Sequence, residues 1–277
     1  MLLVDEAIPI ESDFSLFPQL SSDRLAFFQY TSGSTGAPKG VMVSHGNIIA
    51  NLALIDTLIE GKCQTVCSWL PPFHDMGLIG GILYPLIQNI HSILMAPTTF
   101  LKSPFFWLKT ISDYKVNISP APNFAYEMCV SSITEEQKKE LDLSSWIMAL
   151  NGSEPVNAKT LCQFSEKFSS CGFRAESFYP AYGMAETTLM VSGKKPGDKT
   201  IILDVDKEVL LESHKIKADT AAKSILSIVD CGYTTPEHEV KIINPQSQQV
   251  LDSWEVGEIV VDGLSITQGY WEMHQNS

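Results

Sequence analysis

Positive charge is scarce in this sequence. Its 277 residues include 19 Lys and Arg against 32 Asp and Glu, which gives a formal net charge of −13. Adjacent basic residues form isolated pairs, Lys138-Lys139 and Lys194-Lys195. We expect no nucleic-acid partner, because neutralising phosphates along a nucleic acid needs clustered Lys and Arg. The acidic balance favours solubility, and it still allows a local anion site made of backbone N–H groups and one Lys.

Long apolar runs, a leader segment and metal-type cysteine spacing are also missing. The most apolar stretch, residues 78–86, contains Pro85 and is too short for a bilayer, so it predicts a buried helix and no membrane span. The first nine residues carry Asp5 and Glu6 without a basic segment, and we expect no signal peptide. The six Cys lack zinc-like spacing, which favours free thiols in a reducing cytoplasm.

The composition predicts a folded, well-packed chain. Hydrophobic residues make up 44% and charged residues 18% of the sequence, which argues against general disorder. Apolar runs that predict strands alternate with 3.6-residue patterns that predict helices, beginning at Ser44 as an N-cap, at Ser103-Pro104, after Pro122 and over 156–168. The predicted strands are 25–30, 41–43, 65–70, 93–95, 116–119, 146–150 and 176–179. This alternation favours an α/β fold, a layered and mostly parallel sheet flanked by helices.

The pattern changes after residue 191. Residues 194–223 are rich in charge and lack a clear core period, and three strands are predicted behind them at 225–229, 239–243 and 258–262, with a turn at Asn244-Pro245. We therefore predict two parts. Residues 1–191 form the α/β subdomain, and residues 192–277 form an inserted segment followed by a small β-rich subdomain.

A loop rich in Ser, Thr and Gly follows the first predicted strand. It reads Thr31-Ser32-Gly33-Ser34-Thr35-Gly36-Ala37-Pro38-Lys39-Gly40. Gly lets backbone N–H groups converge on one point, and the hydroxyls and the Lys add donors and charge, so the loop suits a polyphosphate. The spacing between its glycines excludes a Walker A loop. The alternative interpretation is a flexible hairpin loop.

This loop resembles the phosphate-binding loop of the adenylate-forming superfamily, which includes acyl-CoA synthetases, peptide-synthetase adenylation domains, luciferases and fatty-acyl-AMP ligases. Three later motifs follow in the family's order, so that the resemblance covers about residues 25–272. They are Asn151-Gly152-Ser153-Glu154-Pro155, Tyr182-Gly183-Met184-Ala185-Glu186, and Gly257-Glu258-Ile259 with Gly269-Tyr270-Trp271.

The resemblance implies a role for each motif with ATP and Mg²⁺. The β- and γ-phosphates would be bound by Thr31, Ser32, Gly33, Ser34, Thr35, Gly36 and Lys39, and the adenine by Gly152, Ser153, Glu154, Tyr182 and Gly183. Glu186 would hold Mg²⁺, as a carboxylate beside phosphates can. Taken alone, Glu186 could be a solvated surface residue, Tyr182 a core tyrosine, and Gly-Ser-Glu-Pro an ordinary turn.

Two features resemble the fatty-acyl-AMP ligase branch. Residues 70–81 read Leu-Pro-Pro-Phe-His-Asp-Met-Gly-Leu-Ile-Gly-Gly. The resemblance of this run implies that His74 would lie near the nucleotide and the acyl group. We count His74 with Lys39 and Glu186 as catalytic candidates, although a lone His is more often structural. Residues 194–223 resemble an insertion that would restrain domain rotation and disfavour CoA. The alternative is a tolerated surface loop.

The resemblance implies that a fatty acid and Mg-ATP form acyl-AMP, and that the acyl group then passes to an acyl carrier protein or a polyketide synthase carrier domain. Residues 76–83 and 100–107 are candidates for the acyl pocket. The family's ribose-binding Asp and its C-terminal adenylation Lys are expected beyond residue 277, so we expect a partial catalytic core that binds nucleotide weakly and adenylates poorly. The alternatives are an acyl-CoA synthetase fragment and a non-catalytic nucleotide-binding or interaction module.

Overall fold

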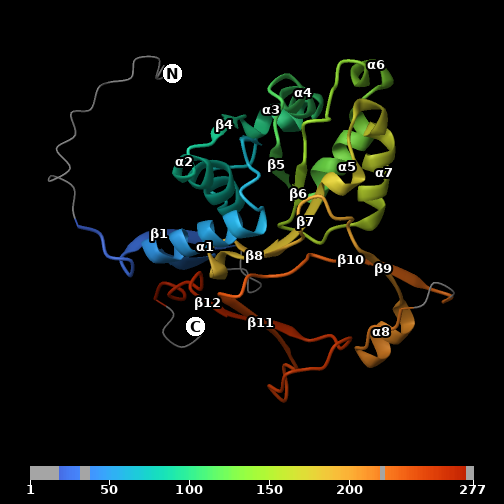
Figure 1. Cartoon of the computed structure of the whole chain (residues 1–277). Coiled ribbons are helices and arrows are strands. Elements are labelled where there is room, and N and C mark those ends of the chain that lie inside the picture. The colour runs from blue at the N-terminus through green and yellow to red at the C-terminus, as the bar shows by residue number, and fades with distance from the viewer. Residues whose placement is uncertain (1–18, 32–37, 219–221, 273–277) are drawn as a thin grey trace.

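The computed structural model describes residues 19–31, 38–218 and 222–272. Its centre is a six-stranded sheet with strand order β4-β3-β5-β6-β7-β8 (Figure 1). The first five strands run parallel and β8 runs antiparallel to β7. The predicted α/β fold with a mostly parallel sheet is therefore confirmed. The strands are β3 (Thr65–Ser68), β4 (His91–Leu94), β5 (Ile118–Ala121), β6 (Met148–Asn151), β7 (Phe178–Gly183) and β8 (Met190–Gly193).

Both faces of this sheet are covered. Successive side chains of a strand point to opposite faces, and here each face has a separate apolar core. One core packs the sheet against α4 (Phe105–Asp113), α5 (Asn123–Ser132) and α7 (Ala158–Phe168), and the other packs it against α1 (His45–Leu58) and the π-helix η2 (Met76–Leu83). A parallel sheet requires this double cover. Cys67, Ala149 and Phe178 belong to the core with α4, α5 and α7, and their chain neighbours Val66, Met148 and Tyr179 belong to the core with α1 and η2.

The chain enters this core through a hairpin. Strands β1 (Leu25–Thr31) and β2 (Lys39–Ser44) pair antiparallel, as predicted. Ser44 then caps α1, because its hydroxyl accepts a hydrogen bond from Asn47 N at 3.1 Å and its own backbone N donates to Asn47 Oδ1 at 3.1 Å. This reciprocal capping fixes where the helix begins. The loop between the strands, residues 32–37, lies outside the described residues.

Several helices differ in detail from the prediction. The apolar run 78–86 forms the π-helix η2 followed by α2 (Tyr84–Ile87), where a single buried helix was expected. Helix α4 has Pro104 as its N-cap, so the expected cap at Ser103 was wrong; Ser103 instead ends the preceding α3 (Pro97–Lys102). The remaining short helices are α6 (Glu135–Lys138), η3 (Ser169–Cys171), η4 (Ala175–Ser177) and η5 (Ala185–Thr187).

Two small antiparallel sheets follow the large sheet. The predicted strands are confirmed as β10 (Ile225–Val229), β11 (His238–Ile243) and β12 (Glu258–Gly263), and β11 pairs with β12. The strand β9 (Ile202–Asp206), which pairs with β10, and the helix α8 (Lys207–Ser213) were not predicted. These elements, orange to red, lie along one side of the large sheet (Figure 1). The division at residue 191 stays a prediction.

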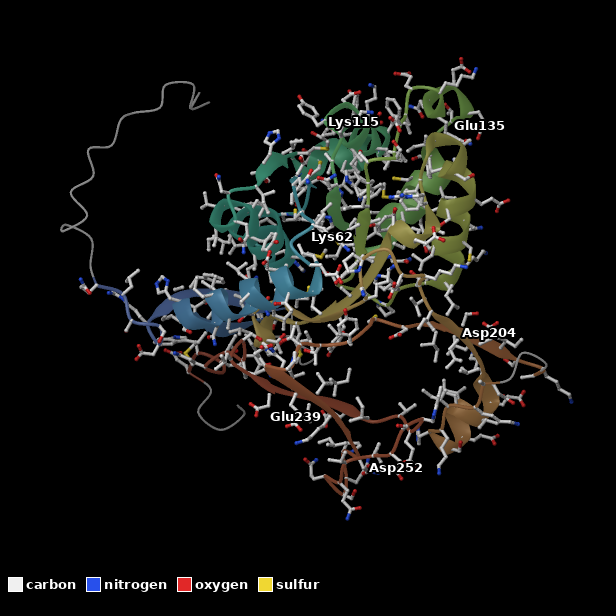
Figure 2. All side chains as sticks on the ribbon, viewed as in Figure 1. Lys62, Lys115, Glu135, Asp204, Glu239 and Asp252 are labelled. Carbon is white, nitrogen blue, oxygen red and sulfur yellow. The ribbon has the colours of Figure 1, made fainter. Side chains whose placement is uncertain are left out.

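The surface is lined with charged side chains. Lys115, Glu135 and Glu239 are exposed, and they lie around the outside of the large and small sheets (Figure 2). The six Cys are free thiols, as expected. Among the helices in the described part of the chain, none is long and apolar enough to cross a membrane.

Candidate active site

A cavity of about 740 Å³ extends along one face of the sheet and reaches the carboxyl ends of the parallel strands. Its walls include Pro120 of β5, Leu150 and Gly152 at the end of β6, and Ala181 and Tyr182 of β7. Ligand pockets of proteins span about 300–1,000 Å³, and open α/β sheets bind ligands at this edge. The position and size of the cavity make it the candidate active site.

One end of the cavity is polar. It is lined by Thr31, His74, Asp75, Ser153, Tyr182 and Glu186. These side chains come from separate stretches of the chain, and one buried amide helps to join them: Gln29 on β1 donates from Nε2 to Phe73 O at 2.9 Å. This bond ties the turn that carries His74 to the strand that carries Thr31.

The rest of the cavity is apolar. Its lining includes Ile55, Ile59, Cys63, Val66, Ile118 and Met148, from α1 and one face of the sheet. Tyr84 also lines it, and the Tyr84 hydroxyl donates to Asp56 Oδ1 at 2.9 Å. Burial raises the pKa of Cys63 to about 12, so its thiol is neutral at physiological pH. This end offers hydrocarbon contacts and no charge.

The two expected acyl-pocket segments fall in different places. Met76 and Gly80 line the cavity, in agreement with the expectation for residues 76–83. Phe100 and Trp107 are fully buried in the core on the opposite face of the sheet, and they are not among the described residues that line the cavity. Residues 100–107 are therefore no longer candidates for the acyl pocket.

Some of the predicted motif residues line the cavity and others do not. Thr31, Gly152, Ser153, Tyr182, Gly183 and Glu186 line the cavity together, whereas Ser32, Gly33, Ser34, Thr35 and Gly36 lie outside the described residues. Glu154 is exposed and does not line the described walls; its Oε1 accepts a hydrogen bond from Phe124 N at 2.7 Å, in the first turn of α5. The Glu154 carboxylate thus serves a helix start, which does not support its expected adenine contact.

Glu186 lies in a turn whose geometry is closely fixed. Its backbone oxygen accepts from Thr267 N at 2.9 Å. Thr188 beside it has a φ of 73°, a conformation that a β-branched residue rarely adopts, and its hydroxyl donates to Ser265 O at 2.7 Å. A Cβ on Gly183 would come 1.9 Å from Leu189 O, so only Gly permits the turn to fold back this closely.

Asn51, fully buried on α1, holds the same turn. Its Nδ2 donates to Thr187 O at 3.1 Å and to Met190 O at 2.8 Å, and its Oδ1 accepts from Met190 N at 3.1 Å. One side chain therefore provides hydrogen-bond partners for three buried backbone groups. Leaving these groups without partners would cost free energy of folding. Nothing in the motifs pointed to Asn51 as a site residue.

A tyrosine that sequence reasoning did not select contacts Glu186. The Tyr270 hydroxyl donates to Glu186 Oε1 at 2.6 Å. Burial, together with this bond, raises the pKa of Tyr270 to about 12. Lys39 does not line the described part of the cavity; its Nζ lies 5.0 Å from the centroid of the Tyr270 ring. The signal that could have found Tyr270 was its place in the Gly269-Tyr270-Trp271 motif.

His74 is paired with its neighbour. Its Nδ1 lies 2.7 Å from Asp75 Oδ1, and its side chain is half exposed. The hydrogen bond to Asp75 raises the pKa of His74, and partial burial opposes that shift. A protonated imidazole at the polar end of the cavity would be a donor for an anionic group.

The carboxylates of the cavity suit a cation bound together with phosphates. Within the described ranges, no group of three or more His, Cys, Asp or Glu could hold a metal by itself. Asp75 and Glu186 are the carboxylates among the described lining residues. Mg²⁺ is usually bound by one or two protein carboxylates, substrate phosphates and water. The donor set fits that mode and does not fit an all-protein metal cage.

Residues 5–271 match the AMP-binding enzyme family, so the match includes the whole cavity. This chain belongs to that family. Among the relatives of this AMP-binding chain is the medium-chain-fatty-acid–[acyl-carrier-protein] ligase TtuA of Teredinibacter turnerae, which is 42% identical over 92% of this chain and 40% of its own length. The long-chain-fatty-acid–AMP ligase FadD26 of Mycobacterium marinum is 36% identical, over 91% of this chain and 44% of that protein.

Solved structures agree. The fatty acid AMP ligase from Legionella pneumophila superposes with a TM-score of 0.88 at 46% identity, over 92% of this chain and 44% of that one. A second structure, of the L. pneumophila fatty acyl-adenylate ligase in complex with acyl adenylate and pyrophosphate, gives the same TM-score and identity. The resemblance to fatty-acyl-AMP ligases is confirmed. The AMP-binding chain spans less than half the length of these relatives.

Proposed function

We propose that this AMP-binding chain carries the nucleotide and acyl sites of an enzyme that activates a fatty acid to acyl-AMP and passes it to an acyl carrier protein. One observation supports this most: a single cavity joins a polar end, with Tyr182 and Glu186, to an apolar end lined by α1 and the sheet. Such a cavity can hold a nucleotide and a hydrocarbon chain side by side. TtuA and FadD26 are named as ligases of fatty acids, and the name of TtuA includes an acyl carrier protein. The free thiols fit a cytoplasmic setting.

Each group at the polar end has a proposed task. The β- and γ-phosphates are bound by Thr31, residues 32–36 and Lys39. The adenine is bordered by Gly152, Ser153, Tyr182 and Gly183. Glu186 would hold the Mg²⁺, which would supply positive charge beside the phosphates. His74 donates to the α-phosphate region, because Asp75 favours its protonated form. Glu154 is left out, since its carboxylate is engaged with Phe124 N.

The proposed reaction needs positioning and charge stabilisation more than proton transfer. A fatty-acid carboxylate oxygen attacks the α-phosphorus of ATP in line with the leaving oxygen, so that a new C(O)O–P bond forms and the bond to pyrophosphate breaks. The apolar end holds the acyl chain, which places the carboxylate at the polar end. The gain in rate comes from groups aimed at the charge that develops on the phosphate.

Pyrophosphate release tests the proposal. The full chain is assayed with Mg-ATP and medium-chain or long-chain fatty acids, beside the L. pneumophila ligase as a positive control. We expect fatty-acid-dependent pyrophosphate release that is weaker than that of the control. ATP binding without any fatty-acid-dependent release would favour a non-catalytic nucleotide-binding module.

A second assay identifies the acceptor. Holo acyl carrier protein and CoA are offered in parallel with the activated fatty acid, and transfer is followed by mass spectrometry. We expect acylation of the carrier protein. Equal or faster transfer to CoA would contradict this part of the proposal and favour an acyl-CoA synthetase.

A further inference from the structure

The segment after β12 returns to the hairpin near the phosphate-binding loop. Trp271 N donates to Gly40 O at 2.8 Å, and Met42 N donates to Gly269 O at 2.9 Å. These bonds place residue 270 opposite Val41 as an isolated β-bridge. The segment is therefore held by backbone pairing, which fixes the position of the Tyr270 side chain independently of its own contacts.

Tyr270 touches two charged groups that stand on different parts of the fold. Its hydroxyl donates to Glu186 Oε1 at 2.6 Å, and the Nζ of Lys39 lies 5.0 Å from its ring centroid. Neither Lys39 nor Glu186 forms an ion pair with any residue in the described ranges. Tyr270 is not itself among the described lining residues of the cavity.

The chemistry of these contacts suits a positioning role. A hydrogen bond to an ionised carboxylate is short and strong, and it fixes which way the carboxylate faces. Because Tyr270 occupies one Glu186 oxygen, the other is left for a cation. The aromatic face holds the Lys39 ammonium by a cation–π contact. A ring cannot neutralise that ammonium, whereas a direct contact with Glu186 would cancel both charges.

We propose that Tyr270 is a positioning residue for the phosphate and Mg²⁺ groups of ATP, acting by orienting Glu186 and by keeping Lys39 available as a separate cation. This inference rests on the proposed function. It assigns a task to a side chain outside the cavity wall and links the β12 end of the chain to the phosphate-binding loop. Loss of the hydroxyl and loss of the ring should therefore have different effects.

The test is ATP binding by the full chain, measured by isothermal titration calorimetry over a series of MgCl₂ concentrations. Tyr270→Phe removes only the hydroxyl, and we expect the Mg²⁺ concentration for half-maximal binding to rise about tenfold, the range for a hydrogen bond to a charged group. Tyr270→Leu also removes the ring, and we expect weaker ATP binding even at saturating Mg²⁺. Tyr114→Phe, at an exposed tyrosine that ends α4, is the matched control and should behave as wild type.

A double variant separates positioning from folding. If Tyr270 acts through Glu186, Tyr270→Phe in a Glu186→Gln background should add no further Mg²⁺ effect. A merely structural role would lower the thermal midpoint and leave the Mg²⁺ dependence unchanged. Should Tyr270→Leu fail to fold, the Tyr270→Phe arm decides, since it removes a single oxygen.

The outcomes distinguish this inference from the proposed function. Mg²⁺-dependent ATP binding by the wild type with an unchanged Tyr270→Phe variant overturns the inference alone. A wild type that binds no ATP, or binds it without any Mg²⁺ dependence, overturns the proposed function and this inference with it. A wild-type Mg²⁺ dependence that is shifted in the Tyr270 variants and in Glu186→Gln, but not in Tyr114→Phe, supports both.

Discussion

The central strands of the six-stranded sheet are far more buried than the strands of the small antiparallel sheets. All four residues of β5 and three of the four of β6 are buried, whereas most residues of β10 and β12 are exposed. The reason is the layering: helices cover both faces of a parallel sheet, and a two-stranded antiparallel sheet leaves a face open. We therefore expect the large sheet to contribute most of the folding stability. The later segment instead contributes contacts to the candidate active site, such as that of Tyr270 with Glu186.

The largest difference between the two regions is expected when one apolar side chain in each is replaced by Ala. Trp146 is fully buried and its ring contacts Trp107, Tyr126 and Phe164, so Trp146→Ala should cost about 3–5 kcal/mol of unfolding free energy. Ile259 on β12 is 39% exposed, and Ile259→Ala should cost under about 1 kcal/mol. Urea denaturation measures both. Equal losses would show that the small sheets are as important to stability as the large one.

A second substitution tests the link between helix α1 and the site. Asn51→Ala leaves two backbone carbonyls and one N–H without their partner, and we expect a loss of about 2–4 kcal/mol together with weaker ATP binding. Asn117→Ala is the control, because Asn117 donates a single long bond of 3.4 Å to Ser145 O. Unchanged ATP affinity in a folded Asn51→Ala protein would mean that the turn keeps Glu186 in place without Asn51.

A third prediction concerns pH. The raised pKa of His74 means that its pairing with Asp75 stabilises the fold fully below the ordinary His pKa of about 6.5, and that this stability is lost as pH rises through the raised value. Asp75→Asn removes the charged acceptor, so the His74 titration should move to lower pH. An NMR titration of the imidazole measures this.

The control for the pH experiment is a surface carboxylate on α4. Asp113 pairs with Lys109 on α4, and Asp113→Asn should leave the His74 titration where it is. A His74 titration that is the same in wild type and Asp75→Asn would show that another group sets its pKa.

The smallest effect is expected at exposed ion pairs, where the two regions should behave alike. Lys115→Ala, which breaks the pair with Asp142, and Lys241→Ala, which breaks the pair with Glu239, should each change stability by less than about 1 kcal/mol, because solvent and salt screen both pairs. Thermal denaturation at low and high salt measures this. A large loss at either position would mean that surface charge, and not burial alone, separates the regions.

The Lys115 pair also has a pH signature. Hydrogen bonding from Lys115 is the main cause that lowers the pKa of Asp142. The stabilisation is therefore present above the ordinary Asp pKa of about 3.9 and is lost as pH falls through the lowered value. Lys115→Ala should reduce the loss of unfolding free energy at low pH. If that loss is unchanged in the variant, the ion pair of Lys115 with Asp142 is not its cause.

The sequence alone determined the local features of this protein. Apolar periodicity located most strands of the large sheet, and the predicted cap at Ser44 located the start of α1. The motifs identified the family and predicted that Thr31, Gly152, Tyr182 and Glu186 share one site. These predictions succeed because helix caps, the alternation of apolar and polar residues, and loop composition depend on residues a few positions apart. The predictions failed where local signals were weak, as for β9 and α8 in the charged segment.

Only the tertiary structure decided which distant residues meet. The bond from Tyr270 to Glu186 joins residues 84 positions apart, and the bond from Asn51 to Met190 joins residues 139 apart. The tertiary structure also directs the Glu154 carboxylate toward Phe124 N, and it places Phe100 on the face of the large sheet opposite to the cavity. Periodicity tells which side of a strand is buried, but the order of the strands and the path of the returning segment decide what each side chain faces, and those depend on packing across the whole fold.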